Sequence, residues 1–260
     1  MSSILCRNRT PLYAPVSNVC SSLVPAGPSR PHLIYPRATG RVFGTFAIVG
    51  WDRHAGEVGV AVVSAVPAAG ALTIFGRGGV GVACAMGLPN PFLALDALDM
   101  IEAGASATEA AAQLERDDPE RTRHQLLVVD MRGEVGAFTG DDLTDWKGHF
   151  TRSGFAVAGN NLVGEAVLGK MIRAYEETDD ILALRLLNAI EAGQEEGGDR
   201  RGKVSAAVLI MRDQPYPYID LRVDDHPNAV KELVRVWKSF RNTVYPYLDS
   251  LPRREPVRKE

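Results

Sequence analysis

Cysteine is scarce in this chain of 260 residues, which has only three. Cys6 and Cys20 fall in the first 44 residues. Cys84 lies inside the apolar run Val80–Met86, where a small, unreactive core residue is expected. The chain beyond residue 44 therefore has no disulfide framework, which is typical of a reducing compartment, and we expect a cytoplasmic protein.

Long apolar runs are also missing. No stretch reaches the ~18 consecutive apolar residues of a membrane-spanning helix, so no membrane partner is expected. The five histidines show no metal-ligand spacing, and no Gly-rich loop leads into a helix, so the sequence predicts neither a metal nor another cofactor. Beyond residue 44 there are 24 basic residues (29 less five) against 32 acidic ones, which disfavours a nucleic-acid partner.

Acidic residues are absent from the first 44 residues, which contain five Arg, six Pro and six Ser. This composition predicts disorder. An Arg-rich, acid-free segment is typical of transit peptides, but the prolines interrupt any amphipathic helix, and a start codon assigned too far upstream explains the segment equally well. We therefore expect a leader, propeptide or misassigned start over 1–44, a single domain over 45–248 and a charged tail over 249–260.

The chain changes character at Gly44-Thr45, where the apolar run Thr45–Trp51 begins. If the mature chain begins at Thr45, one residue carries both a hydroxyl and a free α-amine, and thus its own nucleophile and general base. Gly44 leaves that hydroxyl unobstructed access to the preceding carbonyl, so the junction suits self-cleavage. Translation from a Met directly before Thr45, followed by removal of that Met, would expose the same residue.

Apolar runs and turn signals predict blocks of strands separated by pairs of helices. Thr45–Trp51 and Glu57–Ser64 form a predicted hairpin, which places Ser64 next to Thr45. Strands in blocks favour antiparallel sheets over a doubly wound parallel fold, so the fold class is α+β, with two packed sheets and helices outside. The other expected elements are strands at 71–75, 80–86, 124–130, 134–139, 154–159, 204–212 and 218–223, and helices at 90–104, 106–116, 163–177, 181–196 and 227–247.

A set of short stretches, in order along the chain, resembles a known family. They are Thr45-Phe-Ala-Ile-Val, Gly56-Glu-Val-Gly-Val-Ala-Val, Gly78-Gly-Val-Gly81, Ala137-Phe-Thr-Gly140, Gly159-Asn-Asn-Leu162, Gly197-Gly-Asp-Arg-Arg-Gly202 with Ser205-Ala-Ala, and Asp220-Leu-Arg-Val-Asp-Asp-His-Pro227. The set is similar to the DUF1028 family of the N-terminal nucleophile (Ntn) hydrolase superfamily. The resemblance implies a four-layer αββα sandwich of two largely antiparallel sheets and a Thr or Ser at the mature N-terminus.

The resemblance gives Thr45 the part of the catalytic nucleophile. Acyl transfer also needs donors where an oxyanion develops, and Asn160 and Asn161, in a turn that ends a strand, are the candidates. The same two Asn residues can equally serve their own turn. Ser64, brought next to Thr45 by the hairpin, either orients the amine or faces solvent.

The predicted substrate-binding residues are Asp199, Arg200, Arg201 and Ser205. A forked guanidinium held by Asp199 suits a substrate carboxylate, although Arg beside a helix C-terminus is favourable without any function. Val204 stands where the family pattern leads us to expect a polar residue. A second departure is Ala85-Met86, which stands where the family pattern has Thr-Gln. Together the two departures predict a substrate preference that differs from that of other members.

The resulting prediction is a hydrolase that cleaves an amide-like C–N bond of a small-molecule substrate through an N-terminal Thr. One alternative is a non-catalytic binding protein or pseudoenzyme in which Thr45 stays buried in mid-chain. A second is a protein of the same fold with non-hydrolytic chemistry. Self-association into a homo-oligomer is left open.

Overall fold

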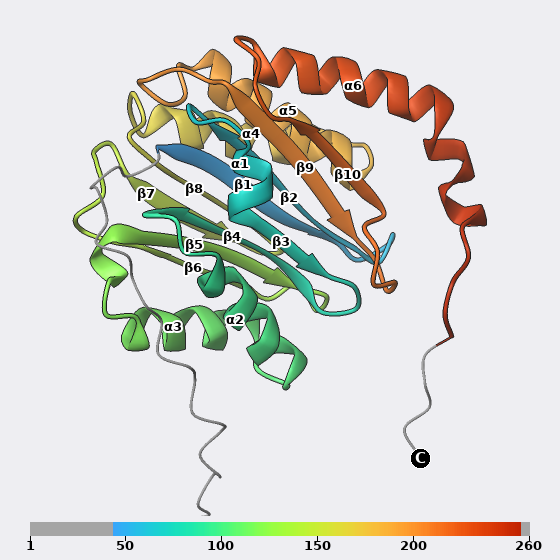
Figure 1. The fold of residues 1–260 in the computed structure, drawn as a ribbon, viewed down its shortest axis with the longest axis horizontal. Helices are drawn as coiled ribbons and strands as arrows, with labels where there is room; N and C mark the ends of the chain where they lie inside the picture. Colours follow the sequence, from blue (N-terminus) through green and yellow to red (C-terminus); the bar gives the residue numbers. More distant parts are fainter. Residues whose placement is uncertain (1–43, 256–260) are drawn as a thin grey trace, which may run out of the picture. The chain divides into compact units, whose positions relative to one another are not determined.

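Two antiparallel sheets packed face to face form the centre of the protein, whose computed structural model describes residues 44–255. Helices cover both outer faces, so the layers run helix, sheet, sheet, helix (Figure 1). The expected four-layer α+β sandwich is confirmed. The six-stranded sheet contains, in spatial order, β10 (Ile219–Val223), β9 (Ser205–Met211), β2 (Glu57–Ser64), β1 (Thr45–Asp52), β8 (Phe155–Asn160) and β7 (Gly148–Arg152). The four-stranded sheet contains β3 (Ile74–Arg77), β4 (Gly81–Gly87), β5 (His124–Asp130) and β6 (Val135–Thr139).

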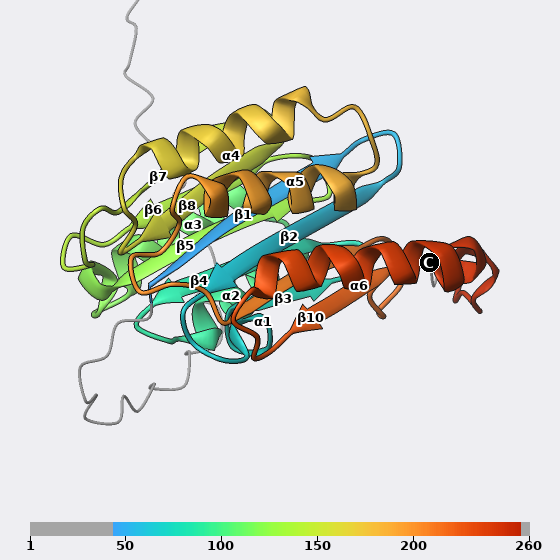
Figure 2. The ribbon, with the colours of Figure 1, turned by 90° about the horizontal axis from the view of Figure 1, so that it is seen from above.

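Each sheet has its own helical cover, which Figure 2 shows from above for the six-stranded sheet. The helices over the six-stranded sheet are α4 (Ala166–Glu177), α5 (Leu182–Glu195) and α6 (Ala229–Thr243). Those over the four-stranded sheet are α2 (Pro91–Glu102) and α3 (Ala107–Asp117). Shorter helical turns are α1 (Ala69–Thr73), η1 (Arg121–Arg123) and η2 (Tyr245–Ser250).

The strand β1 is buried on both faces. Its side chains point alternately toward the covering helices and toward the other sheet, and both sides are packed. Phe46 and Ile48 pack under the helices, whereas Ala47 and Val49 pack between the sheets. A third apolar layer lies between the four-stranded sheet and its helices. By the same alternation, Thr45 belongs to the face between the sheets.

Local signals set the helix starts that the sequence predicted. The side chain of Asn90 accepts a hydrogen bond from the backbone N–H of Phe92 at 3.2 Å, and Pro91 occupies the first turn of α2. Ser106 and Glu109 form the reciprocal capping box of α3. Both helices therefore begin within a residue of their predicted positions.

The structure differs from the expected elements in three places. Residues 71–75, predicted as a strand, divide between α1 and β3, since the Ala-rich run before Thr73 favours a helical turn that the Thr73 hydroxyl closes on the carbonyl of Ala69. The strand β7 was not predicted, because its short, partly polar sequence shows no clear alternation. The last helix ends at Thr243, four residues early, and Pro246 falls in η2.

The end of the described chain packs on the loop between β9 and β10. Gln214 pairs with the backbone of Arg254 in both directions, at 3.2 and 2.8 Å, and the Tyr216 hydroxyl donates to the carbonyl of Pro252. The predicted leader lies outside the described residues except for Gly44, and the predicted tail does so from residue 256 onward. In the described part of the chain, no helix is both long and apolar enough to cross a membrane.

Candidate functional site

Four of the predicted site residues form one row across four neighbouring strands. Thr45 pairs with Ser64 on one side and with Asn160 on the other, and Ser64 pairs in turn with Ser205. All four are buried and lie at one end of the space between the sheets. We call Ser205, Ser64, Thr45 and Asn160 the polar row. The hairpin that was expected to place Ser64 beside Thr45 is confirmed.

A chain of hydroxyls links Thr45 to the peptide bond that precedes it. The Ser64 hydroxyl donates to the carbonyl of Gly44 at 2.8 Å, and its oxygen lies 3.1 Å from the Thr45 hydroxyl oxygen. Since a serine has only one hydroxyl proton, the Thr45 hydroxyl is the donor in the second bond. Ser64 thus accepts from Thr45 and polarises the carbonyl of Gly44.

A charged cradle closes around Gly44 from the loop after α5. Arg201 donates from Nη2 to the carbonyl of Gly44 at 3.0 Å and binds the buried Asp199 through Nε and Nη2. Asn161 donates to Asp199 at 3.0 Å from a left-handed backbone position with φ 58°. A side chain on Gly44 has no room, because a Cβ there would lie 2.5 Å from both Arg201 Nη2 and Asp199 Oδ2.

Gln125 of the four-stranded sheet reaches across to the polar row and fixes the orientation of two amides. Its Nε2 lies 3.1 Å from each of the backbone carbonyls of Gly148 and Gly159, which only a donor can satisfy. Its Oε1 must therefore accept from Asn160, whose Nδ2 is 3.1 Å away. Within residues 44–255, the Oδ1 atom of Asn160 is a buried acceptor without a hydrogen-bond partner.

The comparison with protein families matches the model described as "Family of unknown function (DUF1028)" over residues 45–233. The chain belongs to the DUF1028 family. The match begins at Thr45, the residue on which the polar row is centred.

A solved structure of the same family has the same architecture. The chain is similar to protein SPO2555 from Silicibacter pomeroyi, with 28% sequence identity over 81% of this chain and 95% of that chain and a TM-score of 0.74. Anbu (ancestral beta-subunit) from Yersinia bercovieri is 13% identical, with a TM-score of 0.37 over 81% of this chain and 100% of that chain. No curated protein matches the chain.

In this DUF1028 protein, the side chains of Arg200 and of Ser205, the outermost member of the polar row, bind to the backbone of nearby loops and turns. Arg200 donates from Nε to the carbonyl of Leu162 and so braces the loop. Ser205 donates to the carbonyl of Val66 at 2.6 Å and accepts from the backbone N–H of Ala69 at 3.2 Å. Both side chains hold the loops that frame the polar row.

Three residues near the polar row were missed from the sequence. Gln125 was hidden in an apolar strand, although a Gln in such a strand needs buried partners and was itself the signal. Thr139 and His149 continue its network, with 2.9 Å between Gln125 Nε2 and the Thr139 hydroxyl and 2.8 Å between that hydroxyl and His149 Nδ1. Burial lowers the pKa of His149, which favours its neutral form.

The described residues contain no cluster of metal-binding side chains. Within residues 44–255, no group of three or more His, Cys, Asp or Glu side chains can hold a metal ion. The lone cysteine of this region, Cys84, is buried, and burial raises the pKa of its thiol to about 12.

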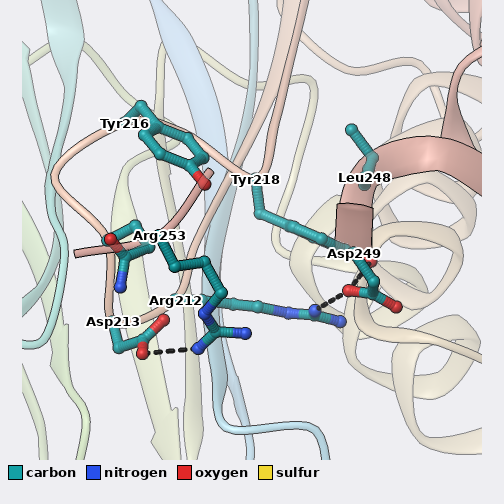
Figure 3. A pocket seen from close by; sticks show the side chains of 8 residues that line it. Arg212, Asp213, Tyr216, Tyr218, Leu248, Asp249 and Arg253 are labelled. Carbon is teal, nitrogen blue, oxygen red and sulfur yellow. Dashed lines mark hydrogen bonds and ion pairs between the residues drawn. The ribbon is translucent and has the colours of Figure 1, made fainter. Parts of the chain in front are cut away.

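A second polar cluster lies at the other end of β2 and β9 (Figure 3). The guanidinium carbon of Arg212 lies over the ring of Tyr218, 3.4 Å from its centroid, and the guanidinium binds Glu57 and Asp249. Asp213 is paired with Arg253. Each of these charges is matched within the cluster, so it fastens the C-terminal segment to the sheet.

Proposed function

We propose that this DUF1028 protein is an Ntn-type hydrolase, with Thr45 as its nucleophile, that cleaves an amide-like C–N bond of a small metabolite. The observation that carries the proposal is the hydroxyl chain from Thr45 through Ser64 to the carbonyl of Gly44. It places a nucleophile, a proton acceptor and a polarised carbonyl on three neighbouring groups at the end of a rigid central strand.

The first reaction is the cleavage of the chain itself. The Thr45 hydroxyl oxygen attacks the carbonyl carbon of Gly44, and the developing oxyanion receives hydrogen bonds from Ser64 and Arg201. Collapse breaks the C–N bond and moves the acyl group to the oxygen, while the hydroxyl proton ends on the released amine. Water then hydrolyses the ester, which leaves Thr45 with a free α-amine.

These donors differ from the predicted pair. Asn160 and Asn161 donate to Gln125 and Asp199, respectively, in the full-length chain. We therefore assign the oxyanion of the first reaction to Ser64 and Arg201, and keep Asn161 as the residue that orients Asp199.

Turnover of a substrate uses the released amine as its base, since its unperturbed pKa of ~7.7–8.0 leaves a useful neutral fraction. The Oδ1 atom of Asn160, buried beside Thr45 in the ladder, supplies an acceptor for an N–H group of the substrate or of the amine. Such an acceptor disfavours a substrate that lacks an N–H there, because Asn160 would stay unsatisfied.

The intact mass of the full-length protein tests the proposal without a known substrate, because the chain is its own first substrate. Wild-type protein is expected to lose the mass of residues 1–44 on incubation. Thr45→Ala is expected to remain full-length, and Thr45→Ser to cleave, since it keeps the hydroxyl. Thr73→Ala, at a buried Thr of α1 that is not part of the row, is the matched control and is expected to cleave as wild type does.

Cleaved protein is then assayed with a panel of small N-acyl amides by release of the amine. Full-length wild-type and Thr45→Ala proteins that both stay uncleaved, with identical activity on the panel, would contradict the proposal. That outcome favours the non-catalytic binding protein, in which Thr45 keeps a peptide nitrogen and its 1% exposure.

A further inference from the structure

The outermost strand of the six-stranded sheet, β10, has an open side. It pairs with β9 along one edge, and within residues 44–255 no strand pairs with its other edge. Helix α6 covers one face of the strand and leaves this edge uncovered (Figure 2). An open edge presents unpaired backbone N–H and C=O groups, which pair readily with another strand.

The side chains of β10 divide cleanly between its two faces. Ile219, Leu221 and Val223 are buried on the α6 side. Asp220 and Arg222 point to the opposite face, where they form an ion pair at 2.8 Å and keep about a third of their surface exposed. The strand therefore carries one negative and one positive charge, two residues apart and symmetric about Leu221.

This charge pattern is complementary to itself. When two copies of β10 run antiparallel with Leu221 opposite the partner's Leu221, Asp220 of each copy faces the partner's Arg222. A register centred on Asp220 or on Arg222 sets like charges opposite one another, as does a parallel register. A shift by one residue sets charged side chains against the apolar face.

We propose that two copies of this chain associate through their β10 edges, antiparallel and centred on Leu221. The two six-stranded sheets then form one continuous sheet. Its twofold axis is perpendicular to the sheet, so α6 of both copies covers the same face. The interface lies on a border strand of the sheet, whereas Thr45 starts the central β1, and it does not depend on the proposed hydrolase activity.

Sedimentation of the full-length protein from about 1 to about 100 µM measures the association. Wild-type protein is expected to be a dimer. Asp220→Arg and Arg222→Asp each turn two attractive contacts into two repulsive ones, by symmetry, and are expected to raise the dimer dissociation constant about tenfold or more. The double variant Asp220→Arg/Arg222→Asp restores both contacts and is expected to dimerise as wild type does.

The most discriminating experiment mixes the two single variants. Asp220→Arg has two positive charges on β10 and Arg222→Asp has two negative ones, so each dimerises poorly alone, whereas an equimolar mixture is expected to form a heterodimer. Asp117→Arg, with the same change of charge on α3, is the matched control and leaves the wild-type dimer intact. Thermal melting verifies that every variant is folded.

Three results would overturn the proposal. A wild-type protein that is monomeric at 100 µM shows that the edge does not associate. Single variants that dimerise as tightly as wild type place the interface elsewhere. A mixture that sediments as monomers, beside a double variant that also does so, shows that the charges do not set the register.

Discussion

At the scale of single residues, the carbonyl of Gly44 is the most informative group, because two donors from distant parts of the chain converge on it. Ser64 comes from β2, and Arg201 comes from the loop after α5. Peptide carbonyls in strands normally bond to backbone N–H groups. Side-chain donors there stabilise negative charge on the oxygen, as an acyl-transfer reaction requires.

Ser64→Ala is predicted to slow the cleavage of the Gly44–Thr45 bond about 100-fold or more, since it removes one oxyanion donor and the acceptor of the Thr45 proton. Intact mass measured over time gives the rate. Ser205→Ala is the matched control in the same row, because Ser205 bonds to Val66 and Ala69 instead. It is expected to cleave at the wild-type rate and to lose about 1 kcal/mol of stability. Equal cleavage rates for both variants would remove Ser64 from the reaction.

Arg201→Lys is predicted to reduce cleavage at least about tenfold with a smaller effect on the melting temperature. A lysine ammonium cannot bind Asp199 in the forked geometry and reach the carbonyl of Gly44 at once. Arg200→Lys is the neighbouring control, since the Arg200 side chain donates to the carbonyl of Leu162 rather than to that of Gly44. This variant is expected to affect melting alone. If both variants lose only melting temperature, the charged cradle is structural.

At the scale of secondary-structure elements, the parts that could be predicted are those set by local chemistry. The capping box at Ser106, the Asn90-Pro91 start of α2 and the hairpin of β1 and β2 follow from neighbours in sequence. The edge strand β7 could not be predicted, because its short, partly polar sequence shows no clear alternation and its pairing with β8 decides it.

The candidate site divides along the same line. Thr45 and Ser64 follow from the hairpin register alone. The approach of Gln125 to Asn160 depends on how the two sheets pack. The hydrogen bond from Arg201 to Gly44 depends on how a distant loop folds. No sequence spacing encodes these distances, so the sequence could not show that Asn160 donates to Gln125 and Asn161 to Asp199.

The cluster at the far end of β2 makes a prediction about pH. Burial raises the pKa of Glu57 above its ordinary value and outweighs the opposing effect of Arg212. The free energy by which the protonated Glu57 stabilises the fold is therefore fully present when the pH is below the unfolded-state pKa of ~4.3. It is lost as the pH rises through the folded-state pKa. The free energy of unfolding of wild type relative to Glu57→Gln should fall as the pH is raised from about 4 toward 7.

Glu109 supplies a control of opposite sign. Its hydrogen bonds with Ser106 lower its pKa, so its contribution is present above the unfolded-state pKa and is lost as the pH falls. Wild type relative to Glu109→Gln should therefore gain stability as the pH rises over the same range. Urea unfolding at a series of pH values measures both differences. Parallel slopes for the two variants would contradict the assignment for Glu57.

At the scale of the whole molecule, the proposed reaction site and the cluster that holds the C-terminal segment lie at opposite ends of β2. Thr45, Ser64 and Asn160 meet at one end, where the described chain begins, and Glu57 and Arg212 bind the C-terminal segment at the other. The cleavage proposed at Gly44-Thr45 would therefore break the chain away from the contacts that hold its C-terminal segment.

A protein that begins at Met-Thr45 is predicted to have a free energy of unfolding within about 1 kcal/mol of that of the full-length chain. Within residues 44–255, every member of the three apolar layers comes after Thr45, so trimming removes none of these side chains. For a domain of this size, 1 kcal/mol corresponds to a shift of about 2–4 °C in melting temperature. A larger loss would show that residues 1–44 contribute to the fold. If the melting temperature is unchanged and the mass shows that the methionine has been removed, the folded chain begins at Thr45. The α-amine of Thr45 can then be titrated directly.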